Sequence, residues 1–328
     1  MTDLIATTPG LYPLPDWAKD ELSELKGHQK GDLIDGDEGP EIADAYQRAR
    51  SEVVDAQADA GLDRVVEGQL RWDDMLAHPL TTHENVETGG IVRYYDNNNF
   101  YRDPQVQGEL TPSGDVAAEL DAVETDALQA VLPGPYSLAD LASDDYYGDE
   151  AEFLDAIADY LAGEIDGFPG HETLFLLEPS LVENPPDEDE NERASEAIDR
   201  VADATDADVV VHTYWGAVPE KTYAHLMDAD VDAIGFDFVT DADASLYNIN
   251  EYGTKSQIAM GLVDGQNTLV ESPETIRDRV EWVQDNTHTD FEQAYLTANT
   301  ELFYLPVNKF EDKLQALGDA AALAEVDA

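Results

Sequence analysis

Short runs of apolar and β-branched residues alternate along the chain with longer stretches in which apolar residues recur every three or four positions. The short runs are typical of parallel strands buried on both faces, and the longer stretches are typical of amphipathic helices. Their regular alternation indicates right-handed βαβ units, and therefore an α/β fold. We predict strands at 4–8, 63–67, 130–132, 173–178, 208–213, 232–238, 257–263 and 293–297, and helices at 41–60, 150–162, 192–204, 219–228 and 272–286.

The number of predicted strands favours a closed (β/α)8 TIM barrel, with an open, doubly wound sheet as the alternative. Segment 91–110 is too polar and too aromatic for a barrel strand, and it predicts a hairpin-like insertion before the third strand. The acidic stretch 183–192 follows a strand and precedes a helix, so we interpret it as a surface loop and not as a linker. We therefore predict a single domain over residues 1–318, with an insertion at about 80–112, and a C-terminal tail at 319–328.

The composition is extremely acidic, since 73 Asp and Glu against 17 Lys and Arg give a formal charge of −56. Self-repulsion opposes a compact state at this charge unless molar salt shortens the Debye length to about 3 Å. The acids are spread along the whole chain, and 42% of the residues are hydrophobic, which excludes intrinsic disorder. We therefore expect a halophilic protein that binds neither nucleic acid nor an anionic membrane, because both would repel it.

Cysteine is absent, which excludes disulfides, thiolate metal ligands and a thiol nucleophile in this chain. The first residues show no basic region followed by an apolar core, and no apolar run approaches the length of about 18 residues that a membrane span needs. We therefore expect a cytoplasmic protein.

Candidate functional residues lie where the predicted strands end, because barrel active sites form at the C-terminal ends of the strands. Glu178, His212 and Asp237 each follow or interrupt an apolar run, so each must be paired, hydrogen-bonded or directed into a cleft. A site role and a satisfied structural hydrogen bond are equal alternatives for these three residues. Further strand-end residues are Glu67, Arg71, Trp72, Asp73, Asp74, Tyr136, Ser137, Tyr214, Trp215, Asp264 and Asn267.

A metal site is a weak alternative at these positions. Glu178, His212 and Asp237 would supply one nitrogen and two oxygen ligands, a set known from catalytic zinc sites, but no close spacing such as His-Glu-x-x-His supports it. Isolated acids such as Asp73 and Asp264 are more often solvated surface residues, and aromatic residues such as Tyr214 and Trp215 more often serve packing.

Eight segments, taken in order over residues of about 5–310, resemble the cobalamin-independent methionine synthases and their uroporphyrinogen-decarboxylase-like barrel superfamily. The segments are TTPGLYPLPDW, AGLDRVVEGQLRWDDM, VLPGPYS, LEPSL, HTYWG, DAIGFDFV, GLVDGQNT and TELFYLPV. Those synthases contain two related barrels. The C-terminal barrel binds zinc through one His, one Glu and two Cys, and this zinc activates homocysteine. The N-terminal barrel has lost that site but contributes to the folate-binding region.

The N-terminal barrel is the more similar of the two. Segment 95–104 is similar to its Asp-Thr-Asn-Tyr-His-Tyr segment, 213–216 to its Thr-Tyr-Phe-Gly, and 261–267 to its Gly-Val-Ile-Asn-Gly-Arg-Asn. In the catalytic half, the first zinc Cys would stand at Tyr214 and the second near 297–299, and both are missing here. The family's Asp-Glu-Pro-Ala-Leu run survives only as Leu-Glu-Pro-Ser-Leu at 177–181. The resemblance therefore implies a barrel without the zinc thiolates.

Taken together, strand ends and resemblance give a candidate substrate-binding set, while the catalytic residues stay unknown. The set comprises Glu67, Arg71, Asp74, Asp96, Asn98, Tyr101, Glu178, His212, Tyr214, Trp215, Asp237 and Asn267.

The resemblance implies a methyltransferase component of methionine biosynthesis. It would transfer a methyl group from a folate-like or corrinoid donor to homocysteine, together with a separate homologous barrel that carries the zinc. A self-sufficient enzyme of the superfamily, using Glu178, His212 and Asp237, is one alternative. A non-enzymatic module that binds a pterin or a corrinoid is another.

Overall fold

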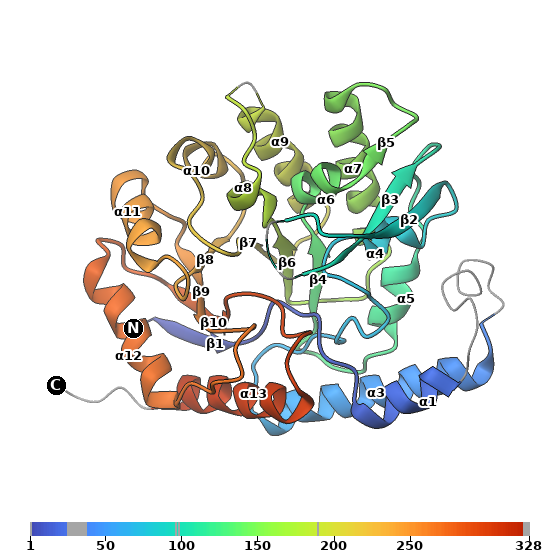
Figure 1. Ribbon diagram of the computed structural model, residues 1–328. Coiled ribbons are helices and arrows are strands. Elements are labelled where there is room, and N and C mark those ends of the chain that lie inside the picture. The colour runs from blue at the N-terminus through green and yellow to red at the C-terminus, as the bar shows by residue number, and fades with distance from the viewer. Residues whose placement is uncertain (1, 25–37, 96, 98, 189, 324–328) are drawn as a thin grey trace.

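The computed structural model describes residues 2–24, 38–95, 97, 99–188 and 190–323. A parallel sheet lies at its centre, and helices surround the sheet on the outside (Figure 1). The strands follow one another in the order β1-β10-β9-β8-β7-β6-β4, and every pair is parallel. They are β1 (Asp3–Ala6), β4 (Gln129–Pro133), β6 (Thr173–Leu177), β7 (Asp208–His212), β8 (Ala233–Asp237), β9 (Gln257–Val263) and β10 (Gln293–Ala298).

Segment 63–65 closes this sheet into a barrel by joining its first and last strands. The amide of Asp63 donates to the carbonyl of Ala6 in β1, over 2.9 Å. On the other side, Val65 donates to Ala127 over 2.9 Å and accepts from Gln129 over 2.8 Å, which makes one parallel bridge towards β4. The predicted (β/α)8 barrel is therefore confirmed.

The predicted second strand at 63–67 is reduced to this single bridge, because a side chain replaces its ladder. The buried amide of Gln57 accepts from the Val66 amide over 2.9 Å and donates to the Val66 carbonyl over 2.8 Å. Both backbone groups of Val66 are thus satisfied without a neighbouring strand.

The helices follow the predicted amphipathic stretches. Their starts carry recognisable signals: the Asp149 side chain accepts from the second and third residues of α7, and Ser272 caps α12 ahead of Pro273. The longer helices are α1 (Asp16–Glu24), α3 (Pro40–Asp59), α7 (Glu150–Ile165), α9 (Asn191–Ala202), α11 (Ala242–Tyr252), α12 (Pro273–Asn286) and α13 (Val307–Ala322). The short ones are α4 (His78–Thr81), α5 (Asp115–Asp121), α6 (Pro135–Leu141), α8 (Ser180–Glu183) and α10 (Glu220–Leu226). None of the helices in the described ranges is both long and apolar enough to cross a bilayer.

The predicted hairpin insertion is confirmed. Strands β2 (Val86–Val92) and β3 (Tyr101–Val106) pair antiparallel, and the two-residue strand β5 (Ser143–Asp144) adds to β3 in parallel. The hairpin lies outside the barrel and packs against α4 (Figure 1).

The last helix, α13, continues past residue 318, where we placed the start of a tail. It packs against the end of α3 so closely that a side chain at Gly318 would collide with the carbonyl group of Ala60. The division into one domain and a tail stays a prediction.

Candidate functional site

Glu178 lies directly after β6 and is fully buried. Its carboxylate accepts hydrogen bonds from the Tyr136 amide over 3.0 Å, the Ser137 amide over 2.8 Å and the Ser137 hydroxyl over 2.5 Å. Burial raises its pKa to about 7. The approach is so close that any side chain at Gly134 would collide with it, which explains the glycine in this turn. Glu178 therefore fixes the first turn of α6. Of the two alternatives, a site role and a satisfied structural hydrogen bond, this arrangement supports the second.

Asp237 is the last residue of β8, and its carboxylate is likewise surrounded by hydrogen-bond donors. It accepts from the amides of Trp215, Val239 and Thr240 over 2.8–3.0 Å, and from the Thr240 hydroxyl over 2.6 Å. The side-chain amide of Asn299 donates to both of its oxygens, over 3.0 and 3.1 Å. Although burial raises its pKa, these donors favour the charged form. Asp237 thus joins the loops after three strands.

His212 ends β7 inside the barrel, and burial lowers its pKa to about 4. The ring is therefore neutral at pH 7, with Nε2 donating to the Asn299 carbonyl over 3.2 Å. Its Nδ1 is buried against Gly235, where any side chain would collide with it. Neither ring nitrogen is directed at a carboxylate of the candidate set.

These three side chains do not fit a common metal ion. Glu178 and Asp237 are saturated by donors of the chain, and His212 uses its Nε2 for a carbonyl. Within the residues that the structure describes, no group of three or more His, Cys, Asp or Glu could hold a metal. The same saturation argues against direct chemistry by Glu178 and Asp237.

Glu67 and Arg71 lie in a buried ion-pair network just after the barrel-closing segment in the chain. Arg71 contacts Glu119 over 2.9 Å and Glu38 over 2.9 Å, while Arg50 pairs with Glu67 over 3.5 Å and also with Glu119. Burial, reinforced by the charge of Glu119, raises the pKa of Glu67 to about 7. The network ties α3 and α5 to the loop after the second strand position.

Asp74 connects that loop to the hairpin. One of its oxygens accepts from the amides of Leu76 and Ala77 over 2.9 and 2.7 Å, and the other accepts from the Arg102 amide in β3 over 2.8 Å. The neighbouring Asp73 forms an ion pair with the Arg102 guanidinium over 2.7 Å.

Four aromatic residues, two from the hairpin segment and two from the loop after β7, form one cluster. The ring of Tyr95 lies 5.3 Å from that of Tyr101 and 5.1 Å from that of Trp215, which in turn lies 5.6 Å from Tyr214. Trp215 has a positive φ of 64°, which is uncommon outside glycine and is typical of strained functional positions. Tyr101, Tyr214 and Trp215 of the candidate set are thus neighbours, as a shared site requires.

The remaining candidates lie at the rim or outside the described residues. Asn267 is exposed and accepts from the Leu269 amide over 3.0 Å, and Asp264 similarly accepts from the Gln266 amide over 3.0 Å. Both are turn residues. Asp96 and Asn98 lie outside the described residues.

Glu301, in the loop after β10, was not among the predicted residues, yet it connects the segment before β3 with the loop after β9. It is 1% exposed, and one oxygen accepts from Asn99 Nδ2 over 2.9 Å and from Gln266 Nε2 over 3.5 Å. Burial raises its pKa to about 7. Its position just past the eighth strand, in the segment TELFYLPV, is the signal that could have identified it.

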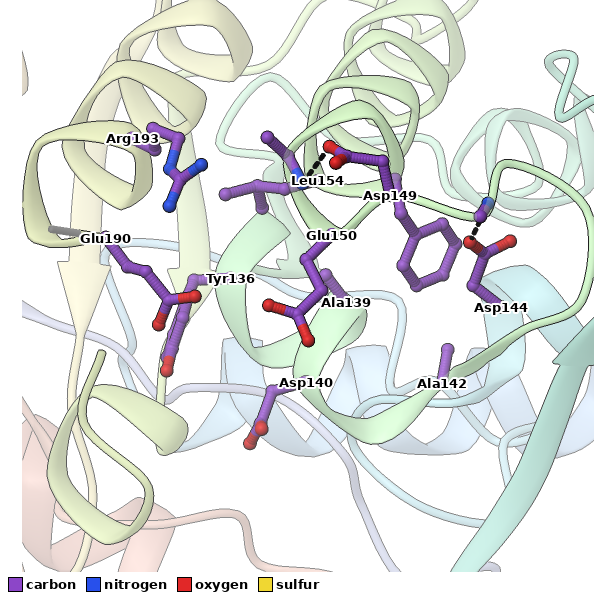
Figure 2. A pocket seen from close by; sticks show the side chains of 13 residues that line it. Tyr136, Ala139, Asp140, Ala142, Asp144, Asp149, Glu150, Leu154, Glu190 and Arg193 are labelled. Atoms are coloured by element: carbon purple, nitrogen blue, oxygen red, sulfur yellow. Dashed lines mark hydrogen bonds between the residues drawn. The ribbon is translucent and has the colours of Figure 1, made fainter. Parts of the chain in front are cut away.

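A separate cavity of about 530 Å³ lies outside the barrel, between α6, α7 and α9. Figure 2 shows Asp140, Glu150 and Glu190 around it, with Arg193 at one end. None of the candidate residues that the structure describes lines this cavity.

Comparisons with known proteins agree with one another. The family described as "Cobalamin-independent synthase, N-terminal domain" matches residues 81–288, more than half of the chain. A methionine synthase of Saccharolobus islandicus is 23% identical over 286 residues, which cover 84% of this chain and 82% of that protein. The methionine synthase of Saccharolobus solfataricus is 24% identical with the same coverage.

Two solved structures share the fold. One is a B12-independent methionine synthase from Shewanella sp. W3-18-1 in complex with selenomethionine, with a TM-score of 0.77, 18% identity and coverage of 98% of this chain and 97% of that one. The other is a putative vitamin-B12 independent methionine synthase from Listeria monocytogenes, with a TM-score of 0.71, 17% identity and 98% coverage of both chains.

Proposed function

This chain belongs to the cobalamin-independent methionine synthase family, a family of methyltransferases, and we propose that it takes part in methyl transfer to homocysteine together with a separate zinc-bearing barrel. The observation that carries this proposal is the lack of zinc thiolates at the barrel mouth. Tyr214 and the segment 297–299 stand where the resemblance puts the two zinc thiolates, and the chain contains no cysteine. The zinc that activates the homocysteine sulfur would come from the partner.

The rim of the mouth supports a partner of this kind. Ile91 and Phe100 of the hairpin are 63% and 53% exposed, and Tyr304, whose hydroxyl accepts from the Phe100 amide, is 44% exposed. Large apolar side chains exposed together on an otherwise acidic surface are typical of a protein interface. A second barrel placed there would face the mouth. The methyl donor would be folate-like or bound to a corrinoid.

The test is a pull-down from a native lysate in molar salt, followed by a reconstituted assay. We expect a homologous, cysteine-containing barrel as the main partner, and methionine formation from homocysteine only when both chains and zinc are present. Supplying a methylated folate or a methylated corrinoid in parallel identifies the donor.

The variant Phe100→Asp should weaken the complex, whereas Tyr247→Asp, at a side chain of similar exposure on α11, should not. Recovery of the chain alone, at a salt concentration where it is folded, would contradict the proposal. So would full activity of the partner without this chain.

A further inference from the structure

Asn299, the residue directly after β10, uses all of its hydrogen-bonding groups although it is almost completely buried. Its backbone amide donates to the Val263 carbonyl over 2.9 Å, and its side-chain oxygen accepts from the Gly265 amide over 3.0 Å. Its side-chain nitrogen donates to both oxygens of Asp237, and its carbonyl accepts from His212 Nε2 over 3.2 Å. One residue therefore ties together the ends of β7, β8, β9 and β10.

A zinc ion does not fit beside this residue. Asn299 belongs to the segment 297–299, where the resemblance puts a zinc thiolate, but zinc in proteins is bound by thiolates, imidazoles and carboxylates. His212 Nε2 carries the hydrogen that it donates to the Asn299 carbonyl, so it has no lone pair for a metal. The backbone is also tightly packed here, because a side chain at Gly261 of β9 would collide with the backbone of Asn299.

The contact between Asn299 and Asp237 is suited to the conditions that the composition implies. Asp237 also accepts from the amides and the hydroxyl described above, and these donors favour its charged form. Hydrogen bonds to a charged acceptor are roughly twice as strong as neutral ones. Molar salt screens exposed charges strongly but buried contacts much less, so this contact keeps its strength there.

Asp237 passes the constraint on to Trp215. Its Oδ2 accepts from the Trp215 amide over 3.0 Å. Trp215 has a φ of 64°, a left-handed conformation that side chains other than glycine adopt only where the surroundings hold them in it. The Trp215 ring lies 5.1 Å from that of Tyr95 in the hairpin segment. The placement of this ring therefore depends on Asp237 and, through it, on Asn299.

We propose that Asn299 is a positioning residue, which together with Asp237 cross-links the strand ends without a metal ion and holds Trp215 against the hairpin segment. The end of this barrel thus has a fixed shape although the chain lacks zinc thiolates. The inference goes beyond the proposed function and does not depend on a partner chain.

Fluorine NMR of the purified chain in molar salt, labelled with fluorotryptophan, follows Trp215 directly. Trp215→Phe identifies its signal among those of the four tryptophans. Asn299→Asp keeps the shape of the side chain but turns the donor into an oxygen that faces Asp237, so it should split or broaden the Trp215 signal. The Trp215 amide should also exchange its hydrogen about ten- to a hundredfold faster, the effect of one charge-assisted hydrogen bond.

Asn191→Asp is the matched control. Asn191 is 3% exposed against 4% for Asn299, and its side-chain amide donates to the carbonyls of Pro186 and Asp187, in the loop between α8 and α9. This variant should lower the melting temperature, as Asn299→Asp does, but leave the Trp215 signal and exchange rate unchanged. The control thereby separates positioning from a general loss of stability.

Two further measurements keep the test independent of one variant. Asp237→Asn breaks the same pair from the other side and serves should Asn299→Asp fail to fold. In the unaltered chain, neither a chelator nor an equimolar amount of zinc chloride should change the Trp215 signal.

Three results would overturn the proposal: an unchanged Trp215 signal and exchange rate in the folded Asn299 and Asp237 variants, the same changes in Asn191→Asp, or a zinc-dependent shift of the Trp215 signal that is lost in His212→Ala. Because no partner chain is present, failure of the proposed complex leaves these results standing.

Discussion

Glu178 and Glu301 show how surroundings decide what a buried charge does. Both are fully buried at strand ends, and burial raises the pKa of each to about 7. Three donors converge on Glu178, one or more on each oxygen. Glu301 receives amide donors on one oxygen only. Replacing each carboxylate by an amide should therefore change the free energy of unfolding by different amounts.

Glu301→Gln should stabilise the protein at pH 8 and have little effect at pH 5. A carboxyl pKa raised from 4.5 to about 7 means that the folded state holds its proton more tightly than the unfolded chain. The corresponding stability is present below pH 4.5 and is lost as the pH rises through 7. Gln carries no charge, so at pH 8 the variant should gain about 2–3 kcal/mol, measured by chemical denaturation in constant molar salt. A loss of stability at pH 8 would show that the free oxygen is paired after all.

Glu178→Gln should stabilise the protein at pH 8 by less than Glu301→Gln does, because the gain from removing a buried charge is offset by the loss of an acceptor for the α6 amides. The amide nitrogen would face the backbone N–H of Tyr136 or Ser137, and that donor would lose its acceptor. Leaving it unpaired costs about 1–3 kcal/mol. Chemical denaturation of both variants under the same conditions compares their free energies of unfolding. Equal changes in the two variants would mean that burial alone, and not the hydrogen-bond donors, determines the effect on stability.

The sequence identified some of these residues and missed others for physical reasons. Glu178, His212 and Asp237 are recognisable because a polar residue inside an apolar run must be buried. Their partners Ser137 and Asn299 lie after other strands, so whether each acid is saturated cannot be seen locally. Glu301 is one acid among 73, and only its neighbours in space distinguish it.

At the scale of elements, the second strand position shows a case in which the pattern of apolar residues does not predict the hydrogen bonding of a strand. Segment 63–67 has the composition of a strand, but Gln57 of α3 takes the backbone groups that a ladder would use. The helices and the hairpin were predictable because amphipathic spacing and aromatic, polar segments are local properties. A side chain that substitutes for a strand is not local.

Gln57→Ala should weaken the closure of the barrel. Gln57 accepts from Val66 and from the Tyr12 hydroxyl and donates to Val53 and Val66, all within a buried region. Its removal leaves several buried groups unpaired and should cost about 2–4 kcal/mol, with faster hydrogen exchange at the Val66 amide. Asp55→Ala, at an exposed position of the same helix, is the control and should cost less than about 0.5 kcal/mol. Unchanged protection of Val66 in the Gln57 variant would show that the segment closes the barrel without it.

At the scale of the whole molecule, the net charge makes the stability of the fold depend on the salt concentration. With 73 acids against 17 bases, lowering the salt from about 1 M to about 0.01 M lengthens the Debye length from about 3 Å to about 30 Å. Repulsion then acts across the entire surface, and the outer faces of helices, such as that of α9 with Glu192 and Glu196, should unfold first.

We predict loss of tertiary structure on dialysis into dilute buffer and recovery in molar KCl. Near-UV circular dichroism and the melting temperature monitor both changes. Lowering the pH towards the sequence pI of about 4.1 should partly restore compactness at low salt, because carboxylates become neutral. A spectrum and a melting temperature that stay constant over this range of salt would show that the acidic surplus serves another purpose, such as binding a basic partner.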